Sequence, residues 1–94
     1  WKVYVIQTDS GKLYTGITTD LERRFAEHLS GKKGARFFHF SNPKTLLFQE
    51  EHPCRSTATK REIEIKKMSR KQKLKLICDQ DHIYLIENFT EERV

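Results

Sequence analysis

The stretch LYTGITTDLERRFAEH, residues 13–28, places a phenol, two guanidinium groups and an imidazole close together in the chain. The phenol is Tyr14, the guanidinium groups belong to Arg23 and Arg24, and the imidazole is His28. Arginine suits phosphate because its planar fork offers two aligned donors. Tyrosine has an ordinary pKa of about 10, so a phenol acts as a base only where neighbouring cations favour the phenolate. The stretch fits either an enzyme or a basic fold that binds acidic partners.

Three segments of the chain are predicted to form strands that position these groups. Two of them, KVYVIQ (2–7) and KLYTGIT (12–18), flank a short loop, DSG, that ends in Gly11. A three-residue loop of this kind suits a type I turn followed by a left-handed residue. The third segment, TLLFQEE (45–51), follows a basic loop over residues 30–44.

The length of the hairpin loop fixes which side chains share a face. It pairs Tyr4 with Gly16 and Ile6 with Tyr14, so even-numbered residues of both strands lie on one face of the sheet. Tyr4 and Tyr14 then become diagonal neighbours, and Gly16 leaves open space beside Tyr4. A turn longer or shorter by one residue would put the two phenols on opposite faces.

The segment TTDLERRFAEHLSGKKG is predicted to form a helix that carries Arg24 and His28. Thr or Asp can cap its start, and Gly31 follows its last turn. Apolar residues four apart define its predicted buried stripe: Leu21, Phe25 and Leu29. At about 100° per residue, Arg24 and His28 lie roughly 60° from that stripe, on its rim, and Arg23 lies about 200° away. Arg24 is therefore the arginine expected to reach a site between helix and sheet.

Two more helices are predicted after the third strand. One begins near Ser56, and the next covers residues 69–77 with Ser69 and Gln72 in a capping-box arrangement. The segment HIYLI (82–86) either adds a strand or covers part of the body. The expected fold class is α/β (α+β), with a small three-stranded antiparallel sheet flanked by helices.

Glu62 stands out on the first of these two helices. Ala58 precedes it by four residues and Ile65 follows it by three, so all three share one helical face. A carboxylate on a core-facing stripe is unfavourable unless it is paired or bound to a metal. Glu64 points to the opposite side and is expected to be solvated.

Length and composition limit the class of protein. The chain of 94 residues has room for a single core. No apolar run approaches the roughly 20 residues that cross a bilayer, and the start is not a signal peptide, so a cytoplasmic protein without a membrane partner is expected. The only cysteines, Cys54 and Cys78, form no CxxC pair, so we expect two reduced, partly buried thiols and no zinc site.

Charge divides the chain into a basic body and an acidic extension. Residues 1–78 hold 17 Lys and Arg against 8 Asp and Glu, a net charge of +9. Residues 79–94 carry a net charge of −4. A body this basic favours polyanions through counterion release.

The order VYV, YTG, a helix with Arg24 and His28, and a glutamate on a later helix resembles the GIY-YIG nuclease superfamily, and in particular its small single-domain bacterial branch. The resemblance covers roughly residues 1–78, which we therefore assign as a GIY-YIG-like nuclease domain followed by the extension at 79–94. Lys2 stands where the first motif has glycine, and Thr15 stands where the second has isoleucine.

The resemblance implies a role for each candidate residue. Tyr4 and Tyr14 would hold or deprotonate the attacking water, and Arg24 would bind the scissile phosphate. His28 would assist proton transfer or phosphate contact. Glu62 would hold one divalent ion, Mg²⁺ or Mn²⁺, for which a single carboxylate suffices because Mg²⁺ keeps several waters. The implied function is a metal-dependent DNA endonuclease of repair or processing.

Basic residues near this site are expected to contact the nucleic-acid backbone. They are Lys32, Lys33, Arg36, Lys60, Arg61, Lys66, Lys67, Arg70 and Lys71. The substrate is DNA, with RNA as the alternative. A domain this small has no separate specificity module, so either a protein partner supplies specificity or the domain cuts with little preference.

Structural alternatives stand beside each of these roles. The tyrosines fit ordinary sheet aromatics, Arg24 fits an ion pair with Glu27, His28 fits a helix-end cap, and the basic run fits a solvated face. Two other functions are retained: a catalytically silent nucleic-acid-binding module, and a protein-interaction domain whose acidic extension covers the basic face.

Overall fold

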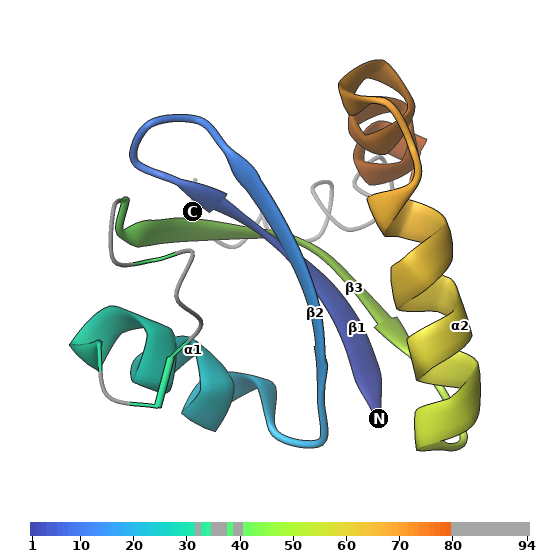
Figure 1. Cartoon of the computed structure of the whole chain (residues 1–94), viewed down its shortest axis with the longest axis horizontal. Coiled ribbons are helices and arrows are strands. Elements are labelled where there is room, and N and C mark those ends of the chain that lie inside the picture. The colour runs from blue at the N-terminus through green and yellow to red at the C-terminus, as the bar shows by residue number, and fades with distance from the viewer. Residues whose placement is uncertain (32, 35–37, 39–40, 80–94) are drawn as a thin grey trace, which may run out of the picture.

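The protein, seen here as a computed structural model, forms a three-stranded antiparallel sheet with three helices (Figure 1). The structure describes residues 1–31, 33–34, 38 and 41–79. The elements in chain order are β1 (Lys2–Thr8), β2 (Leu13–Thr18), α1 (Leu21–Ser30), β3 (Pro43–Glu51), α2 (Arg55–Lys66) and a third helix over residues 70–79. The strands lie in the order β2-β1-β3, which confirms the predicted fold class.

The hairpin between β1 and β2 has the predicted register. Tyr4 pairs with Gly16 and Ile6 pairs with Tyr14. Gly11 closes the turn with a left-handed φ of 85°, which glycine adopts without steric strain. The two phenols therefore lie on the same face of the sheet.

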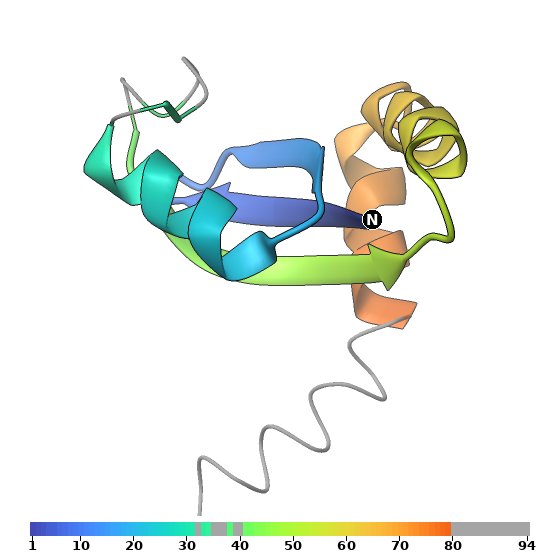
Figure 2. The same ribbon diagram turned by 90° about the horizontal axis from the view of Figure 1, so that it is seen from below.

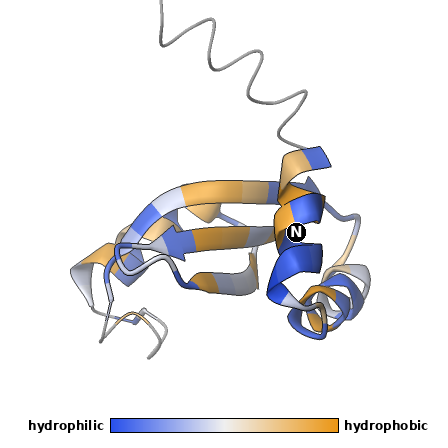
Figure 3. Ribbon diagram, turned by 90° about the horizontal axis from the view of Figure 1, so that it is seen from above, coloured by the Kyte–Doolittle hydropathy of each residue, from blue (hydrophilic) through white to orange (hydrophobic). Residues whose placement is uncertain are grey.

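The central strand β1 is buried on both faces because each face supports its own apolar cluster. Val3 and Val5 pack with Phe48, Ala58 and Ile65, which joins the odd-numbered face to α2. The even-numbered face carries a second cluster, centred on residues of β1 and flanked by residues of α1: Tyr4, Ile6, Phe38, Tyr14, Leu21, Phe25 and Leu46. Figure 2 shows the sheet almost edge-on, with α1 at one end and with α2 and the third helix at the other. In Figure 3 the middle of the sheet is hydrophobic, whereas α2 is mainly hydrophilic.

Helix α1 begins and ends as predicted but buries a different residue. The Asp20 side chain accepts a hydrogen bond from the backbone N–H of Arg23 at 3.1 Å, and Gly31 ends the helix with a φ of 76°. Leu29, expected on the buried stripe, is 55% exposed, whereas His28, expected on the rim, is 2% exposed.

Helical geometry explains this correction to the predicted stripe. His28 follows Leu21 by seven residues and lies only about 20° from it around the helix, whereas Leu29 lies about 80° from it. Leu21 and Phe25 are half-buried, and with Leu29 they line an apolar groove of about 500 Å³ between α1 and β3.

The remaining helices follow the sequence closely. Helix α2 begins one residue before the predicted start, and the capping box of the third helix is confirmed, since Ser69 N–H donates to Gln72 Oε1 at 2.9 Å and Gln72 N–H donates to Ser69 Oγ at 3.2 Å. The prediction of partly buried thiols is wrong: Cys54, the N-cap of α2, and Cys78, near the end of the third helix, are both exposed.

The structure bears differently on two further predictions, the missing membrane span and the role of the C-terminal segment. Among the described residues, no helix combines the length and apolar character needed to span a bilayer. The HIYLI segment and the extension from residue 80 onward lie outside the described residues.

Candidate active site

Tyr4 forms the centre of the candidate site and depends on Gly16. Its side chain is only 1% exposed and extends over the opposite strand. A Cβ atom at position 16 would lie 2.5 Å from the Tyr4 hydroxyl, 2.7 Å from Tyr4 Cζ and 3.1 Å from Tyr14 Cε2. Any side chain at this position would displace the phenol, so the space predicted beside Tyr4 is the space that the phenol itself occupies.

His28 reaches the same phenol from helix α1. Its Nε2 atom lies 2.9 Å from the Tyr4 hydroxyl, and the bond is buried. The imidazole also packs against Phe38 and Tyr14, with ring centroids 4.3 Å and 5.4 Å away. The hydrogen bond therefore lies in a largely apolar, aromatic enclosure.

This enclosure keeps both partners of the hydrogen bond uncharged near neutral pH. Burial lowers the pKa of His28 to about 4, and the positive charge of Arg24 acts in the same direction. Burial, followed by the charge of Tyr14, raises the pKa of Tyr4 well above its ordinary value, although Arg24 opposes the rise. A neutral phenol and a neutral imidazole share one proton along this bond.

Arg24 lies beside Tyr4 and is held by two acceptors. Its Nη1 atom donates to Glu27 Oε1 at 3.0 Å and to the backbone carbonyl of Lys33. Lys33 is the only non-glycine residue with a positive φ in the described ranges. Burial alone would lower the pKa of Arg24, but the hydrogen bonds to Glu27 and Tyr4 leave it raised.

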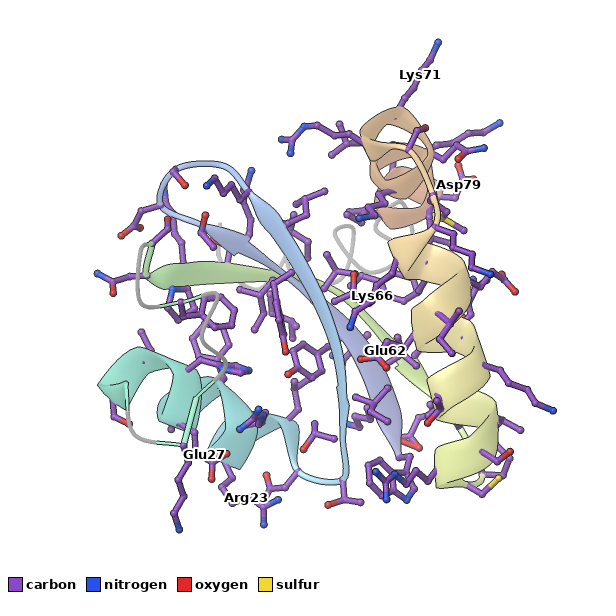
Figure 4. The ribbon with its side chains drawn as sticks, viewed as in Figure 1. Arg23, Glu27, Glu62, Lys66, Lys71 and Asp79 are labelled. Atoms are coloured by element: carbon purple, nitrogen blue, oxygen red, sulfur yellow. The ribbon has the colours of Figure 1, made fainter. Side chains whose placement is uncertain are left out.

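The contrast between the two adjacent arginines follows the predicted helical geometry. Arg24 is half-buried and interacts with Tyr4, whereas Arg23 is exposed. Figure 4 shows Arg23 at the outer side of the helix. The pairing of Arg24 with Glu27, retained above as a structural alternative, is present and leaves the other guanidinium nitrogens outside that ion pair.

Glu62 approaches the same phenol from α2. Its side chain is 19% exposed, and its Oε2 atom lies 3.3 Å from Nζ of Lys66. Figure 4 shows both side chains extending from α2 toward the sheet. The negative charge of Glu62 is close enough to contribute to the raised pKa of Tyr4. Glu64, on the opposite side, is 61% exposed and forms an ion pair with Arg61.

The single carboxylate of Glu62 fits a magnesium ion, which needs few protein ligands, better than a metal that needs three or four. The described residues contain no group of three or more His, Cys, Asp or Glu arranged to hold a metal. Mg²⁺ is commonly bound through one or two carboxylates, with water and substrate oxygens completing its octahedron. Glu62 supplies one such carboxylate, and its partner Lys66 is 53% exposed.

The predicted basic residues do not form one uniform surface. Arg61 is held by Glu50 and Glu64, and Lys66 by Glu62, so these cations are partly neutralised. Others are exposed and make no ion pair within the described part of the chain: Lys33, Lys60, Lys67, Arg70 and Lys71. Lys32 and Arg36 lie outside the described residues.

One contributor, Phe38, was not assigned to the site from the sequence. Phe38 is 5% exposed and packs its ring against both Tyr14 and His28. It comes from the basic loop, where spacing gives no periodic signal, and two other phenylalanines lie beside it in sequence. The aromatic wall behind the hydrogen bond was therefore visible only in three dimensions.

Comparisons with known proteins bear on the family and the fold of this chain. A family model described as the GIY-YIG catalytic domain matches residues 1–75. A UPF0213 protein of Yersinia pestis (strain Pestoides F) is 47% identical over 83 residues, covering 88% of this chain and 86% of that protein. A UPF0213 protein of Yersinia pseudotuberculosis (serotype O:1b) matches with the same identity and coverage. The solution NMR structure of a UPF0213 protein from Bacillus halodurans is 37% identical, covers 81% of this chain and 80% of that one, and superposes with a TM-score of 0.52.

Proposed function

Since the chain belongs to the GIY-YIG catalytic-domain family, with UPF0213 proteins as its relatives, we propose that it is a metal-dependent endonuclease that hydrolyses phosphodiester bonds in DNA. The observation that carries this proposal is the convergence on Tyr4 of side chains from three separate elements. His28 and Arg24 come from α1, Tyr14 from β2 and Glu62 from α2. Hydrolysis of a phosphodiester needs a nucleophile, a cation at the developing charge and stabilisation of the leaving oxygen.

Tyr4 and His28 supply the proton transfer in this proposal. The phenol donates its proton to Nε2 of His28, because the imidazole is neutral and can accept there. In the same step the Tyr4 oxygen accepts a proton from the attacking water, which leaves hydroxide, a neutral phenol and a protonated imidazole. Tyr14, whose ring centroid lies 6.2 Å from that of Tyr4, helps to orient the water.

Arg24 acts as the phosphate clamp. Its contacts to Glu27 and to the Lys33 carbonyl both use Nη1. The fork of a guanidinium presents further donors in the same plane, and these suit two oxygens of one phosphate. Glu27 therefore holds the guanidinium in position while its outer edge binds substrate.

Glu62 is the residue that would hold the divalent ion. When bound, Mg²⁺ or Mn²⁺ supplies positive charge to the phosphate and to the leaving oxygen. The basic body supports DNA as the substrate class, and RNA offers the same phosphate chemistry. No separate specificity module accompanies the site in the described residues, so a protein partner or low selectivity remains part of the proposal.

The test is cleavage of supercoiled plasmid, flap DNA and single-stranded oligonucleotides with Mg²⁺ or Mn²⁺. The variants Glu62→Gln and Arg24→Lys are compared with Glu64→Gln and Arg23→Lys, which make the same changes at neighbouring positions outside the site. We expect metal-dependent cleavage that falls by about 100-fold or more in the first pair and is retained in the second.

Two outcomes would contradict the proposal. If none of these substrates is cut, the chain is a nucleic-acid-binding module on the same fold, and filter binding will show affinity without cleavage. If the site variants cut as fast as their controls, the activity belongs to a contaminant or to other residues.

A further inference from the structure

A second basic site lies where the β-hairpin meets the third helix. Lys12 and Leu13 of the hairpin, together with Arg70 and Lys73 of that helix, line a shallow hollow of about 280 Å³. Arg70 and Lys73 are three residues apart and therefore share one helical face. The hollow is thus built from two segments far apart in the sequence, and three of its four lining residues are cations.

A hydrogen bond fixes the two walls of this hollow relative to each other. Arg70 Nη2 donates to the backbone carbonyl of Gly11 at 2.9 Å, across 59 positions of the sequence. This contact uses one of the five guanidinium donors. The hairpin therefore holds Arg70 in place, and this contact leaves the other N–H groups of the guanidinium for a ligand.

Within the described residues, no carboxylate neutralises the charge of the hollow. Lys12, Arg70 and Lys73 form no ion pair with any carboxylate in the described part of the chain, and no Asp or Glu lines the hollow. Elsewhere, by contrast, Arg61 and Lys66 each have carboxylate partners. Three cations placed together repel one another, so an anion bound among them relieves that repulsion.

We propose that this hollow binds a backbone phosphate of the nucleic acid, at a position separate from the candidate active site. The proposal rests on nucleic acid being the ligand of the protein, as argued above. An Arg fork with two lysines suits a phosphodiester, whose two free oxygens accept several donors. The site reads no base; it contributes affinity and fixes the orientation in which the strand crosses the protein.

The test is the salt dependence of binding to a fluorescent 20-base-pair duplex, measured by anisotropy in EDTA so that no cleavage occurs. The variant Lys12→Gln/Arg70→Gln/Lys73→Gln is compared with Arg23→Gln/Lys44→Gln/Lys75→Gln, which removes the same charge from exposed positions outside the hollow. Lys75 lies on the same helix as Lys73, about 200° around it. Lys12→Gln/Lys73→Gln alone retains the Arg70–Gly11 contact in case its loss destabilises the fold.

We expect the slope of log K against log salt to become shallower by about 0.9 in the triple variant, because the phosphate contact of the hollow is lost. The charge-matched control should keep the slope of the parent. Equal slopes for the hollow variant and the control would overturn the proposal.

Cleavage, measured separately with Mg²⁺, distinguishes this result from failure of the proposed function. A parent that binds with the expected difference in slope but cuts nothing would retain the phosphate site and lose the nuclease assignment. A parent that cuts, with no difference in slope, would retain the nuclease and lose the phosphate site.

Discussion

The Tyr4 hydroxyl and Nε2 of His28 lie 2.9 Å apart in a part of the molecule where both side chains are at most 2% exposed. This contact joins the central strand to α1 through an otherwise apolar cluster. Because both groups are buried, the loss of either one removes a buried hydrogen bond from the other. The same pair therefore contributes to stability and stands at the centre of the proposed chemistry.

Replacing Tyr4 by phenylalanine separates these two contributions. The ring remains, but the proton donor is lost and Nε2 of His28 is left without this partner. We expect the free energy of unfolding to fall by about 1–3 kcal/mol and single-turnover cleavage to fall by about 100-fold or more. Urea denaturation and cleavage at one fixed pH measure the two effects.

Phe48→Leu provides the control for loss of stability alone. Phe48 is 3% exposed and belongs to the cluster on the opposite face of the sheet, with Val3 and Val5. Its truncation is expected to lower stability by roughly 1–2 kcal/mol through a small cavity. If this variant lost as much activity as Tyr4→Phe, the effect of Tyr4 would be structural and the proposed proton transfer would be wrong.

The lowered pKa of His28 predicts that acid destabilises the protein. The unfolded chain takes up a proton near pH 6.5, whereas the folded state resists it until about pH 4 because the imidazole is buried. The unfolded state thus binds more protons between these values, and stability falls as pH falls. The contribution is fully present above about pH 6.5, and its loss amounts to about 3 kcal/mol on reaching pH 4.

His28→Gln tests this dependence while keeping a polar side chain at the position. Urea unfolding at several pH values between 4 and 7 gives the difference in the free energy of unfolding between parent and variant. The carboxylates common to both proteins contribute equally, so their titration drops out of this difference. We expect the parent to lose its advantage toward pH 4. Parallel stability curves for the two proteins would show that His28 is not the group responsible.

The close approach of Gly16 to Tyr4 predicts that a single methyl group disrupts the site. In Gly16→Ala the new Cβ would lie 2.5 Å from the Tyr4 hydroxyl, so the phenol must move. We expect a loss of about 1–3 kcal/mol in stability and of roughly 100-fold in cleavage, since misplacement by about 1 Å is enough for such an effect.

Gly31→Ala is the matched glycine control. Gly31 has a φ of 76° and open space where its Cβ would be. The substitution strains the backbone by about 1–2 kcal/mol without touching the site, and cleavage should be retained. Equal activity of Gly16→Ala and the parent would mean that the position of the phenol is not critical.

The periods of strands and helices predicted those parts of the site that depend on which face of an element a residue occupies. The loop length set the strand register and brought Tyr4, Tyr14 and Gly16 together, because the side-chain period of a strand is two. Helical spacing put Glu62 on the face of Ala58 and Ile65, both fully buried, and it separated Arg24 from Arg23. These are relations within one element or between adjacent ones.

The features that the sequence did not reveal all depend on how distant elements dock. The face that α1 buries against the sheet includes His28 and excludes Leu29, a choice that its own periodicity does not make. The carbonyl of Lys33 and the ring of Phe38 enter the site from the segment between α1 and β3, whose sequence has no periodic pattern. Side-chain patterning specifies elements better than it specifies such contacts.

Thr15, which stands where the family motif has isoleucine, yields a prediction about stability. It is 3% exposed, and its Oγ1 is the only buried side-chain nitrogen or oxygen without a hydrogen-bond partner among the described residues. Thr15→Val keeps the shape of the side chain but removes its hydroxyl. We therefore expect about 1 kcal/mol of added stability in urea denaturation. Cleavage should be unchanged, because the residue faces away from Tyr4.

Thr8→Val is the control. Thr8 is 1% exposed, but its Oγ1 accepts a hydrogen bond from the Lys12 N–H at 3.1 Å, so loss of this hydroxyl should destabilise the protein by about 1 kcal/mol. Destabilisation by both variants would show that the Thr15 hydroxyl has a partner, such as a buried water, that offsets its burial.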